Sequence, residues 1–495
     1  MADFIKINQA DNVIIALKDF VAGEIISVDG AELKMVNDTP KGHKIALVSI
    51  SENLDIIKYG APIGHATTAI SAGEHIHVQN IKTNLSGTVN YSFNQKLNEL
   101  NHGKRNLTFQ GYKRENGKVG IRNELWIVPT VGCVNGQAQQ IVDLFKSEVV
   151  PENIDAVEVF KHSYGCSQLG DDHVNTQKAL ADVINHPNAG GVFVLGLGCE
   201  NNQIDQLKTF IGDFDEKRVR FLVAQEVEDE IEAGLEIMKE IYEVMRNDTR
   251  ETVPVSELNI GLKCGGSDGF SGITANPLVG VFSDFLVAQG GTTILTEVPE
   301  MFGAETLLME RAENKEVFDK TVSLINDFKD YYLQHNLPVY ENPSPGNKKG
   351  GISTLEDKSL GCTQKGGVAT VVDVLKYAEP IKKKGLNLLS APGNDLVAAS
   401  ALGFSGCQMV LFTTGRGTPF GSFVPTMKIS TNSDLYNKKK NWIDFNAGSL
   451  LEGKTMEELL ELFVQFIIDV ASGKQLNHEK SGFKEIAIFK TGVTL

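Results

Sequence analysis

The sequence predicts a multidomain α/β protein, in which a small all-β domain precedes two α/β domains with parallel sheets. Its 495 residues exceed what one hydrophobic core normally serves. Residues 1–90 are dense in short β patterns that Gly-containing turns separate. After residue 111, continuous apolar runs alternate with helical patterns, which is typical of parallel sheets covered by helices.

The first domain is predicted from short apolar segments with strand character. They are Asn12–Leu17, Ile25–Val28, Lys44–Val48 and Ile56–Lys58. Residues 91–110 are rich in Asn and lose apolar periodicity, so they indicate a linker. We place the domain boundaries at 1–92, 93–110 for the linker, 111–250 and 251–495. A linker of this length would let the small domain act as a lid, which is a hypothesis.

The middle domain is predicted from four strands and the helical patterns between them. The strands are Leu125–Val131, Ala156–Phe160, Val192–Leu197 and Val219–Val223; the helices are Ala138–Phe145, Asn175–Ile184 and Glu226–Met245. This order of elements is that of a doubly wound parallel sheet, with right-handed crossovers.

The last domain shows the same alternation over a longer stretch. Its predicted strands are Ile260–Cys264, Thr292–Leu295, Ala369–Val372, Leu386–Leu389, Met409–Phe412 and Ile486–Ile488, and Met456–Ser472 has the apolar spacing of a half-buried helix. Glu341–Gly367 is rich in Gly, Pro and Lys and is predicted to be a long loop, which in a compact domain is usually functional or disordered.

Charge and targeting signals exclude several classes of partner. The formal net charge is −16, which disfavours nucleic acid and anionic membrane surfaces. No apolar run reaches the roughly 18–20 residues that span a bilayer, and the first residues lack a secretory signal, so we expect a cytoplasmic protein. The six cysteines include no CxxC pair, which argues against zinc ribbons and two-cysteine redox motifs.

Three predicted strands of the middle domain end in the dipeptide Gly-Cys. Cys133, Cys166 and Cys199 are 33 residues apart, twice over, which is about one strand–helix repeat. Because parallel strands end at one edge of a sheet, where such folds bind ligands, we expect the three loops to converge on one polar site. No P-loop follows a strand and no GxGxxG does, so a nucleotide cofactor is not supported.

The surrounding residues favour recognition of a hydroxylated anion. The third loop is rich in amides (Asn201, Asn202 and Gln203), which can bind neutral hydroxyl groups. Asn135 lies in the first loop, where a helix N-terminus can bind an anion, and Arg122 precedes the first of these strands. His162 lies near Cys166, and a Cys–His nucleophile pair is the competing interpretation.

Acidic and basic residues follow strands of the last domain as well. Cys264, Asp268, Glu297 and Glu300 could hold a divalent cation, and the alternative for the two glutamates is a solvated acidic helix start. Lys263, Ser267 and Arg416 lie at strand ends, where Arg416 could clamp a carboxylate.

Histidines concentrate in the first domain. His75 and His77 would face the same side of a strand, and His43 precedes Lys44. Imidazoles can move protons at neutral pH, whereas a solvated pair on an edge strand is the alternative.

With these residues assembled, the chain resembles the altronate/galactarate dehydratase family of sugar-acid dehydratases. Matching segments run through nearly the whole chain: 41–47, 58–64, 73–77, 111–112, 120–123, the three Gly-Cys loops, 263–268 and 413–417. The resemblance implies a β-clip (SAF-like) N-terminal domain, a linker, a middle domain used for dimerisation and a C-terminal Rossmann-like variant that carries a metal. It also implies an iron-dependent enzyme that needs reducing conditions.

The implied reaction converts D-altronate to 2-dehydro-3-deoxy-D-gluconate and water. A base removes the C2 proton, a metal on the carboxylate stabilises the enediolate, and an acid protonates the departing C3 hydroxyl. The candidate catalytic residues are His43, His77, Lys44 and, in reserve, His162. The candidate substrate-binding residues are Arg122, Cys133, Asn135, Cys166, Cys199, Lys263, Ser267 and Arg416.

We expect Cys264, Asp268, Glu297 and Glu300 to bind the metal, Fe²⁺ or alternatively Mn²⁺, in a homodimer. The sequence leaves three alternatives open. One is a relative that acts on galactarate or another hydroxy acid, and another is an iron–sulfur hydro-lyase that uses some of the six cysteines. The third is a non-catalytic sensor that binds a sugar acid.

Overall fold

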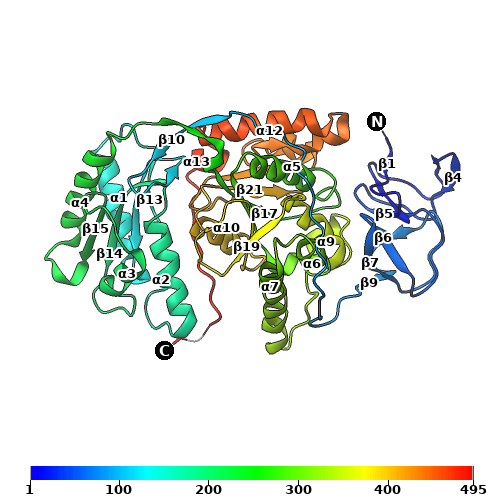
Figure 1. Ribbon diagram of the computed structural model, residues 1–495, viewed down its shortest axis with the longest axis horizontal. Coiled ribbons are helices and arrows are strands. Elements are labelled where there is room, and N and C mark those ends of the chain that lie inside the picture. The colour runs from blue at the N-terminus through cyan, green and yellow to red at the C-terminus, as the bar shows by residue number, and fades with distance from the viewer. Residues whose placement is uncertain (1, 493) are drawn as a thin grey trace.

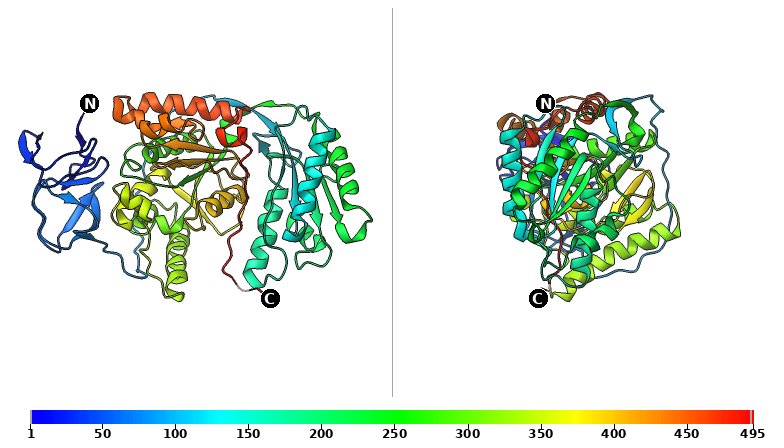
Figure 2. Two further views of the ribbon diagram at one scale, coloured as in Figure 1. Left: turned by 180° about the vertical axis from the view of Figure 1, so that it is seen from behind. Right: turned by 90° about the vertical axis from the view of Figure 1, so that its left-hand side faces the viewer.

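A computed structural model describes residues 2–492 and 494–495 and shows three domains in a row (Figure 1). The C-terminal domain lies in the middle of the row, between the N-terminal β domain and the middle domain of the sequence, and the view from behind agrees (Figure 2). The chain therefore runs from one end of the molecule to the other through the linker before it returns to the centre. No helix of the described residues is long and apolar enough to span a membrane.

The N-terminal domain consists of two small antiparallel sheets and a hairpin. One sheet has the order β1-β2-β5-β8, the other β6-β7-β9, and β3 pairs with β4. The bounds are β1 Phe4–Ile5, β2 Val13–Ala16, β3 Ile25–Val28, β4 Ala31–Lys34, β5 Lys44–Ala46, β6 Asp55–Lys58, β7 Ala61–Ala66, β8 His75–Ile76 and β9 Ile81–Lys82. Strand β5 begins at Lys44, directly after His43, and pairs with β8, which carries His75.

The linker is extended and bound along the C-terminal domain rather than free. Gln95 donates hydrogen bonds of 2.9 Å to the carbonyls of Ala312 and Glu313, and Arg105 pairs with Glu461. Leu100 and Leu107 of the linker pack against the main core of that domain. The linker that connects the N-terminal domain is thus bound to the C-terminal domain. It is not the free flexible segment that the lid hypothesis assumed.

The middle domain has a four-stranded parallel sheet of order β13-β12-β14-β15. Its elements are β12 Glu124–Pro129, α1 Asn135–Glu148, β13 Ala156–Val159, α2 Gly170–Ile184, β14 Ala189–Gly196, α3 Ile204–Ile211, β15 Val219–Val223 and α4 Glu230–Met245. Helices α1 and α4 pack on one face of the sheet; the opposite face shares a core with the C-terminal domain. A small antiparallel sheet of β10 (Thr108–Lys113), β11 (Val119–Gly120) and β16 (Glu251–Pro254) joins the two domains.

The C-terminal domain is built on a seven-stranded parallel sheet of order β19-β20-β18-β17-β21-β22-β23. The strands are β17 Asn259–Cys264, β18 Thr292–Leu295, β19 Val371–Leu375, β20 Leu386–Leu389, β21 Met409–Thr414, β22 Thr426–Ser430 and β23 Phe445–Asn446. The helices are α5 Ala275–Ala288, α6 Glu305–Met309, α7 Lys315–Gln334, α8 Pro345–Lys349, α9 Leu355–Cys362, α10 Asp395–Phe404, α11 Ser433–Lys438, α12 Met456–Ala471 and α13 Asn477–Lys480.

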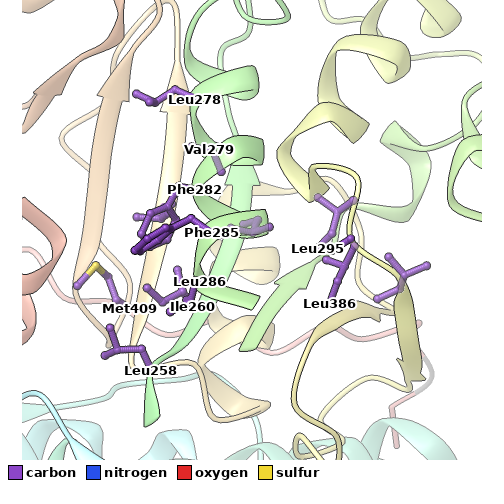
Figure 3. Packing of buried hydrophobic residues seen from close by; sticks show 14 of the residues in the cluster. Leu258, Ile260, Leu278, Val279, Phe282, Phe285, Leu286, Leu295, Leu386 and Met409 are labelled. Carbon is purple, nitrogen blue, oxygen red and sulfur yellow. The ribbon is translucent and has the colours of Figure 1, made fainter. Parts of the chain in front are cut away.

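Helix α5 forms the centre of the main core. Its Leu278, Val279 and Phe282 lie against apolar side chains of the sheet, among them Ile260 and Met409 (Figure 3). Each of these five side chains is at most 2% exposed. The central strands β17 and β21 are thereby fixed, and with them the loops that follow their carboxyl ends.

Two expectations for this domain were wrong, and two strands were not expected. Ile486–Ile488 is not a strand: it is an extended tail whose apolar side chains fill the core between the middle and C-terminal domains. Glu341–Gly367 is not a long loop, because α8 and α9 form within it. Strands β22 and β23 were missed because polar residues interrupt them.

Candidate active site

Two thiols and one carboxylate meet behind the carboxyl end of the central strands. Cys264 ends β17, Glu300 follows β18, and Cys362 ends α9. The Sγ atoms of Cys264 and Cys362 are 3.3 Å apart. Oε2 of Glu300 lies 3.1 Å from Sγ of Cys264 and 3.2 Å from Sγ of Cys362. All three side chains are buried. Among the described residues this is the one group of three or more His, Cys, Asp or Glu ligand atoms that lie close enough together to share a metal ion.

Buried lysines balance the negative charge of this group. Nζ of Lys358 donates a 2.7 Å hydrogen bond to Oε1 of Glu300. Burial by itself would raise the pKa of Glu300, but the charges of Lys358 and Lys365 outweigh it and lower the pKa. The hydrogen bond to Cys264 and then burial raise the pKa of the Cys362 thiol. The Cys362 thiol therefore stays protonated until a cation replaces its proton.

Glu297, predicted as a metal ligand, is occupied elsewhere. Its two carboxylate oxygens accept from Nζ of Lys263 at 2.6 Å and from the backbone N–H of Cys264 at 2.8 Å. Lys263 also donates to Asp395. Both predictions are corrected: Glu297 fixes the backbone of the cysteine ligand, and fully buried Lys263 orients Asp395 instead of binding substrate itself.

Asp268 is the second corrected metal ligand. Its carboxylate accepts hydrogen bonds from Ser271, Thr431 and Asn432, so it holds the loop after β17 against β22. Ser267 beside it is 1% exposed, and its hydroxyl has no partner within the described residues. A buried hydroxyl without a partner is uncommon, and at a strand end it suits a ligand contact.

A cavity of about 780 Å³ opens in front of the three-ligand group. Its lining includes Gly266, Glu300, Asn342, Lys358 and Asp395. Arg416 packs its side chain against Gly266 and is exposed, and within the described chain its guanidinium makes no ion pair. The cavity thus combines the cation Lys358 with amides and carboxylates, and Arg416 adds a second cation beside the lining residue Gly266. These groups bind a carboxylate and hydroxyls.

Three histidines of the N-terminal domain form a cluster against the C-terminal domain. Nδ1 of His43 lies 3.0 Å from Nε2 of His75, and the ring centroids of His43 and His77 are 4.9 Å apart. Nε2 of His43 lies 3.4 Å from the carbonyl oxygen of Lys349 at the end of α8. Burial lowers the pKa of all three imidazoles, to about 4 for His75 and about 3 for His77.

These imidazoles are therefore neutral at pH 7 and can accept a proton. Of the three, His43 reaches Lys349, the last residue of α8, and Asn347 of that helix lines the cavity. None of the described residues that line the cavity is a histidine. His43 and His77 thus lie beside the cavity, and helix α8 stands between them and it. His75, which the sequence placed on the same face as His77 but which was not among the candidate catalytic residues, completes the group.

Lys44 was predicted to be catalytic, and the structure corrects this too. Its Nζ is fully buried and donates to the Gly351 carbonyl at 2.7 Å and to Asp357 at 2.8 Å. Lys58 binds the other oxygen of Asp357 at 2.9 Å. Burial opposes all three charges, yet the two lysines keep the pKa of Asp357 below its usual range. The three charges fix the N-terminal domain to α9.

The three Gly-Cys loops meet, as expected, at the carboxyl edge of the middle sheet. The N–H of Gly132 donates to the Tyr164 carbonyl, and the N–H of Asn202 donates to the Gly165 carbonyl. Cys133, Cys166 and Cys199 are all exposed. The amide of Asn135 is bound to the His162 carbonyl. These loops belong to the domain at one end of the row, and none of their residues lines the cavity described above.

Arg122 and His162 have structural roles, which corrects both predictions. All five N–H donors of Arg122 are used, by Glu479 and three backbone carbonyls, and the side chain is fully buried. His162 uses both ring nitrogens on the backbone, at Pro129 and Tyr164. Neither side chain has a group left for substrate.

Comparisons with known proteins cover the whole chain. Family models match residues 2–84 (altronate/galactarate dehydratase SAF domain), 111–246 (D-galactarate dehydratase/altronate hydrolase, second domain) and 255–494 (D-galactarate/altronate dehydratase, C-terminal). An altronate dehydratase of Bacillus subtilis is 62% identical over all of both chains. The chain belongs to the altronate/galactarate dehydratase family.

Other relatives in this dehydratase family are less similar. An altronate dehydratase of Escherichia coli is 56% identical over 99% of this chain and 100% of its own. A galactarate dehydratase (L-threo-forming) of E. coli is 36% identical over 96% and 94% of the two chains. The resemblance inferred from the motifs is confirmed, and so is the SAF domain followed by α/β domains. The chain is a sugar-acid hydro-lyase.

The residues that the sequence reasoning missed lie mostly on α9. Cys362 completes the three-ligand group, Lys358 lines the cavity, and Asp357 binds the N-terminal domain. Gly361-Cys362 repeats the Gly-Cys pattern of the other loops, which was the available signal. The stretch was predicted to be a loop, so its helical spacing was not considered.

Proposed function

We propose that the chain dehydrates D-altronate to 2-dehydro-3-deoxy-D-gluconate. The two relatives named altronate dehydratases, at 62% and 56% identity over nearly the full length, support this substrate over galactarate, because the galactarate dehydratase is 36% identical. Galactarate or a related hydroxy acid is the alternative substrate.

The observation that carries the proposal is the group of Cys264, Glu300 and Cys362 beside the cavity. Two thiolates and a carboxylate are a donor set for Fe²⁺ and suit the harder Mn²⁺ less well. Three protein ligands leave a coordination position for substrate. When bound, a divalent cation would polarise the substrate's oxygens and lower the cost of charge on the enediolate.

The residues around the cavity would bind and orient the substrate. Burial disfavours the charge of Lys358, but Glu300 outweighs this and keeps the pKa of Lys358 above its usual range, so Lys358 stays a cation whose charge would attract a carboxylate into the cavity. Arg416 would contribute a bidentate contact at the rim. Asn342 and the Ser267 hydroxyl would bind hydroxyl groups of the chain of the sugar acid.

The neutral imidazoles of His43 and His77 are the candidates for proton transfer. One of them would take the proton from C2, and the electrons of that bond would form the C2–C3 double bond as the C3 hydroxyl leaves. The imidazolium would return its proton to the departing hydroxide to form water. The enol product then moves its O2 proton to C3 to give the ketone.

A keto-acid assay over a panel of sugar acids tests this function. Run without oxygen, with and without added Fe²⁺, it should give a kcat/KM for D-altronate at least tenfold above that for galactarate, and only with Fe²⁺. A preference for galactarate would select the alternative substrate. Full activity after exhaustive chelation would remove the metal from the proposal.

The homodimer and the cytoplasmic location that we expected from the sequence stay proposals. The middle domain lies at one end of the row and leaves its outer helices free of contact with the other two domains (Figure 1). Light scattering of the eluting full chain should give twice its mass of 53.9 kDa. A monomer at micromolar concentration would contradict the dimer.

A further inference from the structure

Cys133, Cys166 and Cys199 follow the carboxyl ends of three adjacent strands of the middle sheet. Strand β12 is central, with β13 and β14 on its two sides. Pro129 is level with Leu195, and each is followed four residues later by a cysteine (129 to 133 and 195 to 199). Adjacent strands are about 4.8 Å apart, so the three cysteines occupy neighbouring places along the edge.

The glycines before Cys133 and Cys166 let the first two loops approach one another. A Cβ on Gly165 (φ +97°) would collide with the Thr130 carbonyl, and one on Gly132 would lie 2.8 Å from the His162 carbonyl. Only glycine permits these approaches, which lock the first loop onto the second. The spacing of the cysteines is therefore built into the backbone rather than left to mobile loops.

Each loop also carries a side-chain amide with an atom that has no partner. They are Oδ1 of Asn135, Nε2 of Gln168 and Oδ1 of Asn202, all buried atoms without a hydrogen bond within the described residues. Asn202 is fully buried and Gln168 is 5% exposed. Orphaned buried polar atoms are rare, so three around one set of loops mark a polar site; of the three, Nε2 of Gln168 is a donor, the kind of group that binds the sulfur of a cluster.

The thiols themselves are exposed, unlike the three other cysteines, which are buried. Cys199 accepts a 3.6 Å hydrogen bond from Nε2 of Gln225, and Cys166 lies 3.6 Å from the Ser167 hydroxyl. Exposed cysteines are open to oxidation and other reactions, so three of them at one edge indicate a function. Donors to sulfur are the contacts that tune iron–sulfur centres.

The spacing selects the kind of metal centre. A single tetrahedral ion with bonds of about 2.3 Å to sulfur gathers its ligand atoms within about 4 Å of one another. Within residues 2–492 and 494–495, the one set so gathered is that of Cys264, Glu300 and Cys362. A cubane cluster holds its cysteine sulfurs farther apart, because irons and sulfides lie between them.

We propose that Cys133, Cys166 and Cys199 bind a [4Fe–4S] cluster at the carboxyl edge of the middle sheet. Each thiol loses its proton as its sulfur bonds to one iron of a preassembled cluster, so three protons are released and no atom changes oxidation state. The fourth iron takes a ligand that is not one of these cysteines. The site is independent of the dehydration proposed above, and neither depends on the other.

The test uses the full chain, purified without oxygen and reconstituted with ferrous and ferric iron and sulfide. We expect about four acid-labile sulfides per chain and a broad absorbance band in the visible region. Cys166→Ser and Cys199→Ser should each lower the sulfide content at least fivefold, with the circular dichroism spectrum unchanged because both side chains are exposed.

Two matched variants separate this site from the one in the C-terminal domain. Cys407→Ser, at a buried cysteine outside both sites, should keep the full sulfide content. Cys362→Ser should keep the sulfide while losing iron equivalent to one ion. The proposal is overturned if reconstituted wild-type protein holds no acid-labile sulfide, if Cys166→Ser holds as much as wild type, or if the three thiols bind zinc without sulfide.

Discussion

Glu300 contacts both thiols of the three-ligand group and also lines the cavity, so it tests the metal proposal most directly. Glu300→Gln should lower bound iron at least tenfold, because the amide replaces the one anionic oxygen ligand. Metal analysis after anaerobic loading measures it. Glu356→Gln is the matched control: its carboxylate binds Thr83 and Asn84 and should keep the iron. Equal iron in both variants would contradict the assignment.

The lowered pKa values of His75 and His77 predict a dependence of stability on pH. Well above pH 6.5 these imidazoles are neutral in both the folded and the unfolded chain. Between 6.5 and about 4, the unfolded chain binds protons that the folded chain does not, so the free energy of unfolding falls as the pH falls. His77→Gln cannot protonate and should make this slope shallower in denaturation series from pH 7 to 4.5. An unchanged slope would contradict the burial of that imidazole.

The same variant separates catalysis from packing. If His77 transfers the proton, His77→Gln should lower kcat by at least a hundredfold and leave KM for the sugar acid within a few fold. His77→Ala should behave in the same way if its fold is intact. A kcat near that of the wild type would remove His77 from the mechanism and leave His43 as the candidate.

At the scale of elements, α9 connects the active site to the N-terminal domain. Asp357 binds two buried lysines from β5 and β6, while Lys358, the next residue, lines the cavity. Asp357→Asn leaves two buried ammonium groups without a counter-charge and should cost about 3–5 kcal/mol of unfolding free energy. Denaturant unfolding measures this, and faster proteolysis within residues 2–84 should accompany it.

Lys58→Met is the comparison variant for this element. It leaves Asp357 with Lys44, a neutral pair, so the loss should be clearly smaller than for Asp357→Asn. Equal losses would show that the charge balance at α9 is not what holds the domains together.

The sequence predicted elements well where their apolar pattern was continuous. The strand Val219–Val223 was predicted with its bounds, and α12 differs by one residue from the prediction Met456–Ser472. The prediction from the sequence failed where an element is short or where its buried positions are polar. Helix α9 buries Glu356, Asp357 and Lys358, so no apolar stripe marked it, and the tail at Ile486–Ile488 has a strand's composition without a strand to pair with.

At the scale of the whole molecule, Arg122 holds the middle domain to the C-terminal domain. It pairs with Glu479 of α13, with the carbonyl of Val470 in the last turn of α12 and with the carbonyl of Lys474 after that helix. Arg122→Ala should lower the free energy of unfolding by about 3–5 kcal/mol, because Glu479 is left buried and unpaired. KM for the sugar acid should not change, since Arg122 is outside the cavity.

Arg122→Lys is the companion variant. It keeps the charge but loses the bidentate geometry, so its stability should lie between that of wild type and that of Arg122→Ala. Normal stability of Arg122→Ala together with a raised KM would restore the substrate-binding role that the sequence suggested.

The sequence by itself determined the family, the order of the domains and the residue types available for chemistry, because motifs and apolar periodicity are local properties. Only the tertiary structure decided which of those residues meet. Cys264 and Cys362 are 98 positions apart, and Glu297, three residues from Glu300, is turned to Lys263 instead of the thiols. Burial and pairing of charges set these contacts, and both depend on segments that are distant in the chain.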